Sequence, residues 1–198
     1  MAERINRREL IVQTAANLFS QQGYAATSVR QIAEDVGCTE AALYYHFKGG
    51  KRALLQAVIE DKTPTFLTIL ENCKTATSLP DLILKFGQSA ATFCEVQERH
   101  IQWLTSEFPG LSQEEQALFH AKHIKFHDEL KKLIAPLVEN ESEASDMAWM
   151  LICGTFGYRQ IFIGLELCRY TDFSIEKFIK NMVNCIINIH ENNGHKEA

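Results

Sequence analysis

Residues 28–48 read SVRQIAEDVGCTEAALYYHFK, and this stretch decides the fold. Its first residue, Ser28, predicts a helix start, because a serine oxygen can accept a hydrogen bond from the free N–H groups of a first helical turn. Gly37 allows the positive φ that a tight turn requires, and Thr39 can cap the helix that follows it. The stretch therefore predicts a helix-turn-helix, with helices over residues 28–35 and 39–46.

A further short helix, predicted over residues 5–22, precedes this pair and shares its core. The inward side chains of the three helices are expected to be Leu10, Ala15, Leu18, Phe19, Val29, Ile32, Ala33, Val36, Leu43 and Phe47. Because Leu43 and Phe47 are expected inside, the opposite side of the last helix faces outward, and an α-helix fits the major groove of DNA. The groove-facing set is therefore expected to be Thr39, Glu40, Ala41, Tyr44 and Tyr45.

The rest of the chain repeats apolar residues at helical spacing, with no convincing alternating strand and no internal repeat. Further helices are predicted over 51–73, 79–97, 99–107, 112–135, 141–168 and 174–191, which makes about nine in all. We expect an all-α protein of two domains. A three-helix helix-turn-helix DNA-binding domain over residues 1–50 would precede a larger helical bundle over 51–198, and the helix 51–73 would be shared.

The charge is distributed unevenly along the chain. The net charge is −5, yet residues 1–55 contain seven basic and five acidic side chains, whereas the remainder contains thirteen basic and twenty acidic ones. The positive charge therefore lies at the end that carries the helix-turn-helix, where contact with phosphates requires it.

The six cysteines are widely scattered and include no Cys-x-x-Cys pair, so we interpret them as reduced thiols rather than as a zinc site or a disulfide framework. The first residues lack the pattern of a secretory signal. The longest apolar stretch, residues 147–158, is too short for the ~20 residues that span a bilayer. We expect a cytoplasmic protein that is not inserted in a membrane.

The stretch GYAATSVRQIA at 23–33, with LYYHFK at 43–48 and Lys51, resembles the DNA-binding signature of the TetR family of transcriptional regulators. The resemblance covers residues 5–60 by motif. It implies a homodimer that binds double-stranded, palindromic operator DNA through two recognition helices, and a C-terminal bundle that binds an effector and forms the dimer interface. The implied activity is that of a repressor, not of an enzyme. Gly49-Gly50 is a departure, because many members have one residue fewer before the lysine.

The chemistry of the side chains divides the DNA-binding candidates into two groups. Thr39, Glu40 and Tyr45 can reach base edges, where a carboxylate accepts from cytosine and an aromatic ring contacts a thymine methyl group. Residues placed for phosphates are Thr27, Ser28, Tyr44, His46, Lys48 and Lys51, and Arg30 and Ala41 complete the candidate set. The alternative is that the adjacent tyrosines are only surface aromatics.

Aromatic residues are abundant in the C-terminal part, where they either form core or line a cavity for a small apolar or aromatic effector. The ligand-binding candidates are Phe66, Trp103, His123, Phe126, His127 and Trp149. The helical phase places His123 inward, within an apolar stripe. The spacing of His120, His123 and His127 also fits a metal site, but an ordinary polar flank is the preferred interpretation, and no metal or cofactor is predicted.

Two further features bear on assembly and control. The helices 141–168 and 174–191 are apolar enough to pair with their symmetry copies in a homodimer. Pro64 is expected to kink or split the helix 51–73. No Gly-rich phosphate loop, Gly-x-Ser-x-Gly or His-Glu-x-x-His motif supports an enzyme. Control by metal, by a protein partner or by oxidation of Cys38 remains an alternative to an organic effector.

Overall fold

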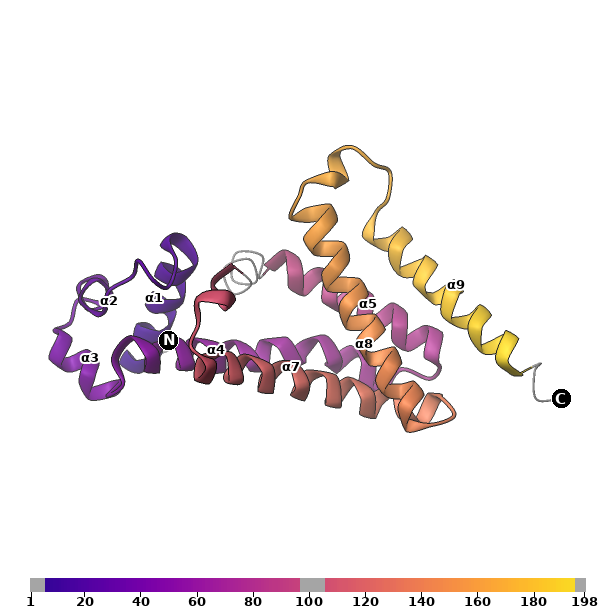
Figure 1. Ribbon diagram of the computed structural model, residues 1–198, viewed down its shortest axis with the longest axis horizontal. Coiled ribbons are helices and arrows are strands. Elements are labelled where there is room, and N and C mark those ends of the chain that lie inside the picture. The colour runs from indigo at the N-terminus through magenta and orange to yellow at the C-terminus, as the bar shows by residue number, and fades with distance from the viewer. Residues whose placement is uncertain (1–5, 97–105, 195–198) are drawn as a thin grey trace, which may run out of the picture. The chain divides into compact units, whose positions relative to one another are not determined.

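The structure is a computed structural model that describes residues 6–96 and 106–194, without the side chains of residues 61–66, 94–96 and 187–194. No strand occurs in these two ranges, and the all-α prediction is confirmed. The helices are α1 (Arg7–Gln22), α2 (Val29–Val36), α3 (Glu40–His46), α4 (Gly50–Glu71), α5 (Leu79–Val96), α7 (Gln113–Ile134), α8 (Glu141–Tyr158) and α9 (Ile175–Gly194) (Figure 1). Most of the helix predicted over 99–107 lies outside the described residues.

The chain divides into two compact units. One comprises residues 1–65 and 97–123, and the other comprises residues 66–96 and 124–198. The sequence predicted a single domain border at residue 50. In the structure, the first unit also includes residues 97–123 from the middle of the chain. Short 3₁₀ turns join the helices at η1 (Asn72–Thr75), η2 (Phe108–Gly110), η3 (Ala135–Leu137) and η5 (Leu167–Arg169).

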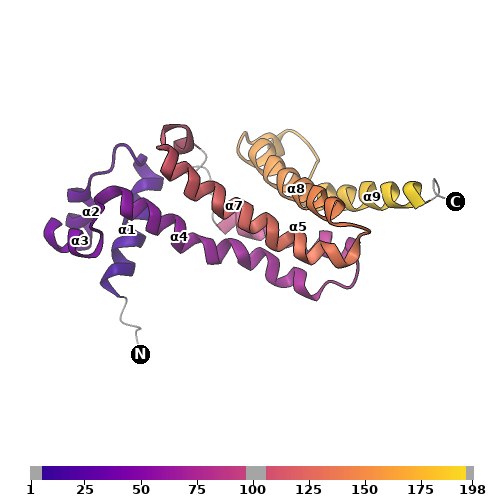
Figure 2. The same ribbon diagram turned by 60° about the horizontal axis from the view of Figure 1, so that its bottom comes forward.

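The helices α1, α2 and α3 and the start of α4 lie together (Figure 2), and their buried side chains form one apolar core. Leu111, which directly follows η2, and Phe119 of α7 join the same cluster. Of the ten predicted core residues, seven are buried in this cluster, Val29 and Val36 are partly buried against it, and Leu10 is 37 % exposed. The physical reason is the phase of α1, because its inward stripe begins at Ile11 and Val12 and continues one turn later through Ala15 and Ala16.

Side-chain caps fix where several helices begin. The Ser28 hydroxyl accepts from the N–H of Gln31 at 3.0 Å, as predicted. At the start of α7, the Ser112 hydroxyl accepts from the N–H of Glu115 at 3.3 Å, and the carboxylate of Glu115 accepts from the N–H of Ser112 at 2.8 Å. This reciprocal capping box satisfies two backbone donors that the helix itself leaves free.

In the second unit, α5 packs against α8 and α9. The helices α5 and α9 approach each other closely at Gly87, where an added Cβ would lie 2.6 Å from a side-chain atom of Ile179. Core side chains contributed by these helices and by α7 include Leu82, Phe86, Ala90, Phe126, Leu130, Leu151 and Ile179.

The helix predicted over 141–168 is ten residues too long, because α8 ends at Tyr158. The chain continues as a single π-helical segment, η4 (Arg159–Ile163), which ends with a hydrogen bond from the N–H of Gly164 to the carbonyl of Arg159 at 2.9 Å. Glu166 then takes a positive φ of 56° and separates this segment from η5. Apolar periodicity did not reveal this end, because Ile161 and Leu165 continue the pattern although both are exposed.

The helix α4 is assigned without a break from Gly50 to Glu71, so Pro64 does not split it. The predicted kink falls on residues 61–66, whose side chains lie outside the described set. In the ranges that the structure describes, no helix is both long and apolar enough to cross a bilayer.

Candidate nucleic-acid interface

The helix α3 exposes the five residues that were expected from the sequence to face outward. Leu43 and Phe47 are buried in the first unit. The exposed residues at the helix start and on its outer side are Thr39, Glu40, Ala41, Tyr44 and Tyr45. Tyr45 is 80 % exposed. The predicted orientation of this helix is therefore confirmed, although its contact with DNA stays a prediction.

Tyr44 is positioned by the glycine pair that follows the helix. Gly50 has a φ of +60°, and its N–H donates to the carbonyl of Phe47 at 2.8 Å. A Cβ at residue 50 would lie 3.2 Å from Cε1 of Tyr44, so the tyrosine ring rests directly on the glycine. The additional glycine thus makes a turn in which only a residue without a side chain fits well.

Gly50→Ala is expected to destabilise the first unit by about 1–2 kcal/mol through the positive φ, and also to displace the Tyr44 ring. Gly37→Ala is the matched control, because Gly37 has a φ of +70° but no atom within 4 Å of its added Cβ. Urea unfolding should show similar losses for both variants, whereas fluorescence anisotropy should show weaker operator binding only for Gly50→Ala. Equal operator affinities would contradict the role of Gly50 in placing Tyr44.

The side chain of Lys51 makes its contacts with other residues of the first unit. Its Nζ donates to the carbonyl oxygens of Tyr24 at 2.8 Å and of Ala25 at 3.2 Å, and it lies 4.5 Å from the centre of the Tyr24 ring. The lysine therefore joins the start of α4 to the turn between α1 and α2. Its predicted phosphate contact would use the same ammonium group that holds this turn.

Tyr24, which Lys51 contacts, is also hydrogen-bonded to α7. Burial, and then the nearby Glu115 carboxylate, raise the pKa of Tyr24 to about 12. The phenol therefore stays protonated at neutral pH and donates to Oε1 of Glu115 at 3.2 Å. Burial disfavours ionisation of Glu115, but hydrogen bonds from Ser112 and Tyr24 outweigh burial and lower the pKa of this carboxyl group. No local sequence pattern indicated that Tyr24 binds the carboxylate of this capping box.

The remaining DNA-binding candidates differ in exposure. Thr27 is buried, and its hydroxyl donates to the carbonyl of Gly23 at 2.8 Å, so its side chain holds the turn before α2. Ser28 is exposed but occupied as the cap of α2. Arg30 is exposed and pairs with Glu34 at 2.8 Å. Lys48 is exposed and His46 is half-buried, with its ring edge-on to Tyr45.

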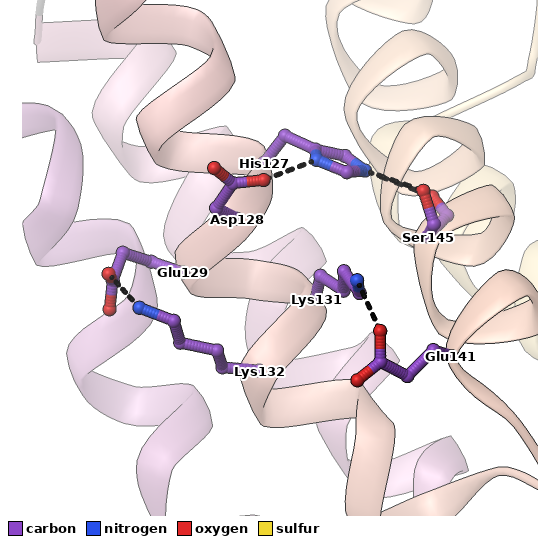
Figure 3. Close-up of polar contacts among 7 residues, drawn as sticks. All are labelled: His127, Asp128, Glu129, Lys131, Lys132, Glu141 and Ser145. Atoms are coloured by element: carbon purple, nitrogen blue, oxygen red, sulfur yellow. Dashed lines mark hydrogen bonds and ion pairs between the residues drawn. The ribbon is translucent and has the colours of Figure 1, made fainter.

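The structure describes the side chains of four of the six ligand-binding candidates, His123, Phe126, His127 and Trp149. Trp103 and the side chain of Phe66 lie outside the described residues. Phe126, His127 and Trp149 belong to the second unit, where the His127 and Trp149 rings stack with their centres 4.3 Å apart. Nε2 of His127 also lies 3.1 Å from the carbonyl oxygen of Ser145, and this contact joins α7 to α8 (Figure 3).

The inward orientation predicted for His123 is wrong, because this residue is exposed and His127 is buried instead. The His123 ring stacks on Phe119 in its own helix, with ring centres 5.7 Å apart. Helical phase gives the direction of a side chain but not whether another element covers that turn. Of the residues described, no three histidine, cysteine or acidic side chains are grouped closely enough to hold a metal ion.

A sequence profile described as bacterial regulatory proteins, tetR family, matches residues 11–58. The helix-turn-helix segment belongs to the TetR family. The HTH-type transcriptional repressor KstR2 of Mycolicibacterium smegmatis is 34 % identical over 98 residues, which cover 49 % of this chain and 46 % of that protein. The matched segments span less than half of the length of the curated relatives. The relatives are named as regulators, in agreement with the prediction that the chain is not an enzyme.

The TetR-type fold extends over most of the chain. Salmonella enterica GusR superposes with a TM-score of 0.75 at 18 % identity, over 95 % of this chain and 98 % of that one. The TetR family transcriptional regulator PfmR from Thermus thermophilus superposes with a TM-score of 0.64 at 18 % identity, over 90 % and 97 % of the two chains. At these identities the likeness shows the fold alone.

Proposed function

We propose that the chain is a TetR-family transcriptional repressor that binds palindromic operator DNA as a homodimer and is released by a small-molecule effector. The observation that carries the proposal is the outer side of α3. It exposes a carboxylate, a methyl group and two tyrosines beside the exposed Lys48, which is a set of groups that can read base edges and contact phosphates.

An exposed apolar side of α8 supports the proposed dimer. Met150, Cys153 and Ile161 are exposed although they belong to the apolar stretch of this helix and its continuation. A soluble chain rarely leaves such a patch uncovered, and a two-fold interface would cover it with its own copy. The side of α9 described up to Ile186 exposes mainly polar residues, so α8 supports the dimer better than α9 does.

The test is selection of duplexes from a random pool by the full-length protein, followed by fluorescence anisotropy at several salt concentrations. We expect an enriched inverted repeat, since each protomer reads one half-site. The logarithm of the affinity should fall with the logarithm of the salt concentration by about 0.9 for each phosphate contacted. Absence of an enriched sequence, with the same affinity for unselected DNA, would contradict the proposal.

A further inference from the structure

One side of α8 is buried along its whole length, and it ends in two polar residues. Spacings of three or four residues place its members on the same side of the helix. They are Ala144, Ala148, Leu151, Ile152, Thr155 and, at the first position of η4, Arg159. Thr155 is 1 % exposed and Arg159 is 3 % exposed. A hydroxyl and a guanidinium group thus continue an otherwise apolar stripe inside the second unit.

The Thr155 hydroxyl is buried without a partner. In the part of the chain that the structure describes, its Oγ1 makes no hydrogen bond. A threonine in a helix can donate to the carbonyl one turn earlier, but this bond is not formed here. A buried unpaired hydroxyl destabilises a fold, and a valine of nearly the same shape would avoid the penalty. A group that enters the unit from outside would provide the missing partner.

Arg159 lies one turn after Thr155, so the two side chains are neighbours on the helix surface. A guanidinium carries five N–H donors in a planar fork, and one carboxylate takes two of them. The side chain can therefore bind an incoming carboxylate beside the protein groups that it already contacts. Arg159 also begins the π-helical segment, and such segments often occur at functional sites.

The helix against which α8 packs is apolar on its buried side. The helix α8 packs against α5. The buried hydrophobic side chains that the structure describes in α5 are Leu79, Leu82, Ile83, Phe86, Ala90 and Phe93. A molecule that reached Thr155 and Arg159 would find its polar partners at this pair and an apolar environment along α5.

We propose that Thr155 and Arg159 bind the carboxylate of a monoanionic, otherwise apolar acid. The guanidinium would bind both carboxylate oxygens, the Thr155 hydroxyl would donate to one of them, and the apolar body of the acid would lie along α5. In identifying this acid as the effector, the inference rests on the proposed function. It also adds an anionic group to the small apolar or aromatic effector expected from the sequence.

The test compares acids with their own primary amides by isothermal calorimetry on the full-length protein without DNA. The pairs are octanoate and octanamide, 3-phenylpropionate and its amide, and indole-3-acetate and its amide. At least one acid should bind tenfold or more tightly than its amide. Arg159→Gln should weaken that acid about 30-fold or more, as loss of one partner from a buried charge pair does. Arg169→Gln, which removes an exposed arginine paired with Glu166, should leave the affinity unchanged.

Thr155→Val separates binding from structure. The valine should raise the melting temperature of the ligand-free protein by about 2–4 °C, because the unpaired hydroxyl is removed. It should also weaken the acid about tenfold, whereas Thr155→Ser should preserve binding. This variant decides the matter even if Arg159→Gln does not fold.

Three results would overturn the inference: no binding of any acid, equal affinity for acid and amide, or unchanged acid affinity in Thr155→Val. Because the measurement contains no DNA, its outcome is separate from that of the operator selection. A chain that binds acids but selects no operator would refute the proposed function while leaving the acid site in place.

Discussion

Phe19→Ala is expected to destabilise the first unit by about 3–5 kcal/mol, a large share of the stability of an ordinary domain. Phe19 is completely buried, and its ring meets the Tyr24 ring edge-on with centres 5.2 Å apart. Its removal would leave a cavity where α1 meets the turn that Lys51 holds. Hydrogen exchange is the appropriate measurement, because amides of α1–α3 should lose protection while those of α8 keep it.

Leu10→Ala is the matched control in the same helix. Leu10 is exposed by more than a third, so truncation should change stability by less than about 1 kcal/mol. The pair also tests how α1 is oriented, since the sequence assigned both residues to the core. Similar losses of protection in the two variants would contradict the orientation of α1 described here.

The sequence predicted the first unit well because its structure depends on local signals. Caps at Ser28 and Thr39, and the glycine at residue 37, act within a few residues of where they stand, so their spacing alone defines two helices and a turn. The contribution of α7 could not be predicted in this way. Glu115 meets Tyr24 across ninety-one positions of sequence, and no local pattern encodes such a partner.

The second unit was predicted less well. Helical periodicity gives the side of a helix on which a residue lies, but it does not tell whether another element packs on that side. His123 has the phase of an inward residue and is exposed, whereas Arg159, which directly follows the apolar stretch 147–158, is buried. A charged residue has a low prior for complete burial. The interior position of Arg159 therefore had to come from the structure, and it is this departure from expectation that points to a site.

In the candidate nucleic-acid interface, too, some side-chain positions follow from neighbouring residues in the sequence and others depend on residues far away in it. The exposure of Tyr45 follows from the burial of Leu43 and Phe47 on the other side of one short helix. The position of Tyr44 also requires the positive φ of Gly50, and the placement of Lys51 requires the carbonyl groups of a turn more than twenty residues earlier. Tyr45 is consequently the residue whose substitution should report on DNA contact with least effect on folding.

Tyr45→Ala is expected to leave stability nearly unchanged and to weaken operator binding roughly 30-fold. The ring is 80 % exposed, so its loss creates no cavity. Each contact with a base is expected to contribute about 1 kcal/mol, and the dimer would lose one contact in each of its two half-sites. Tyr45→Phe should retain most of the affinity if the ring contacts a thymine methyl group, because that contact needs no hydroxyl.

Tyr170→Ala supplies the matched control, since Tyr170 is 82 % exposed and belongs to the second unit. Its operator affinity should equal that of the parent, provided that light scattering shows the same oligomeric state. Anisotropy titrations on the selected operator would compare the three variants at one salt concentration. If Tyr45→Ala bound as tightly as Tyr170→Ala, the outer side of α3 would not read DNA, and the exposed tyrosine would be only a surface aromatic.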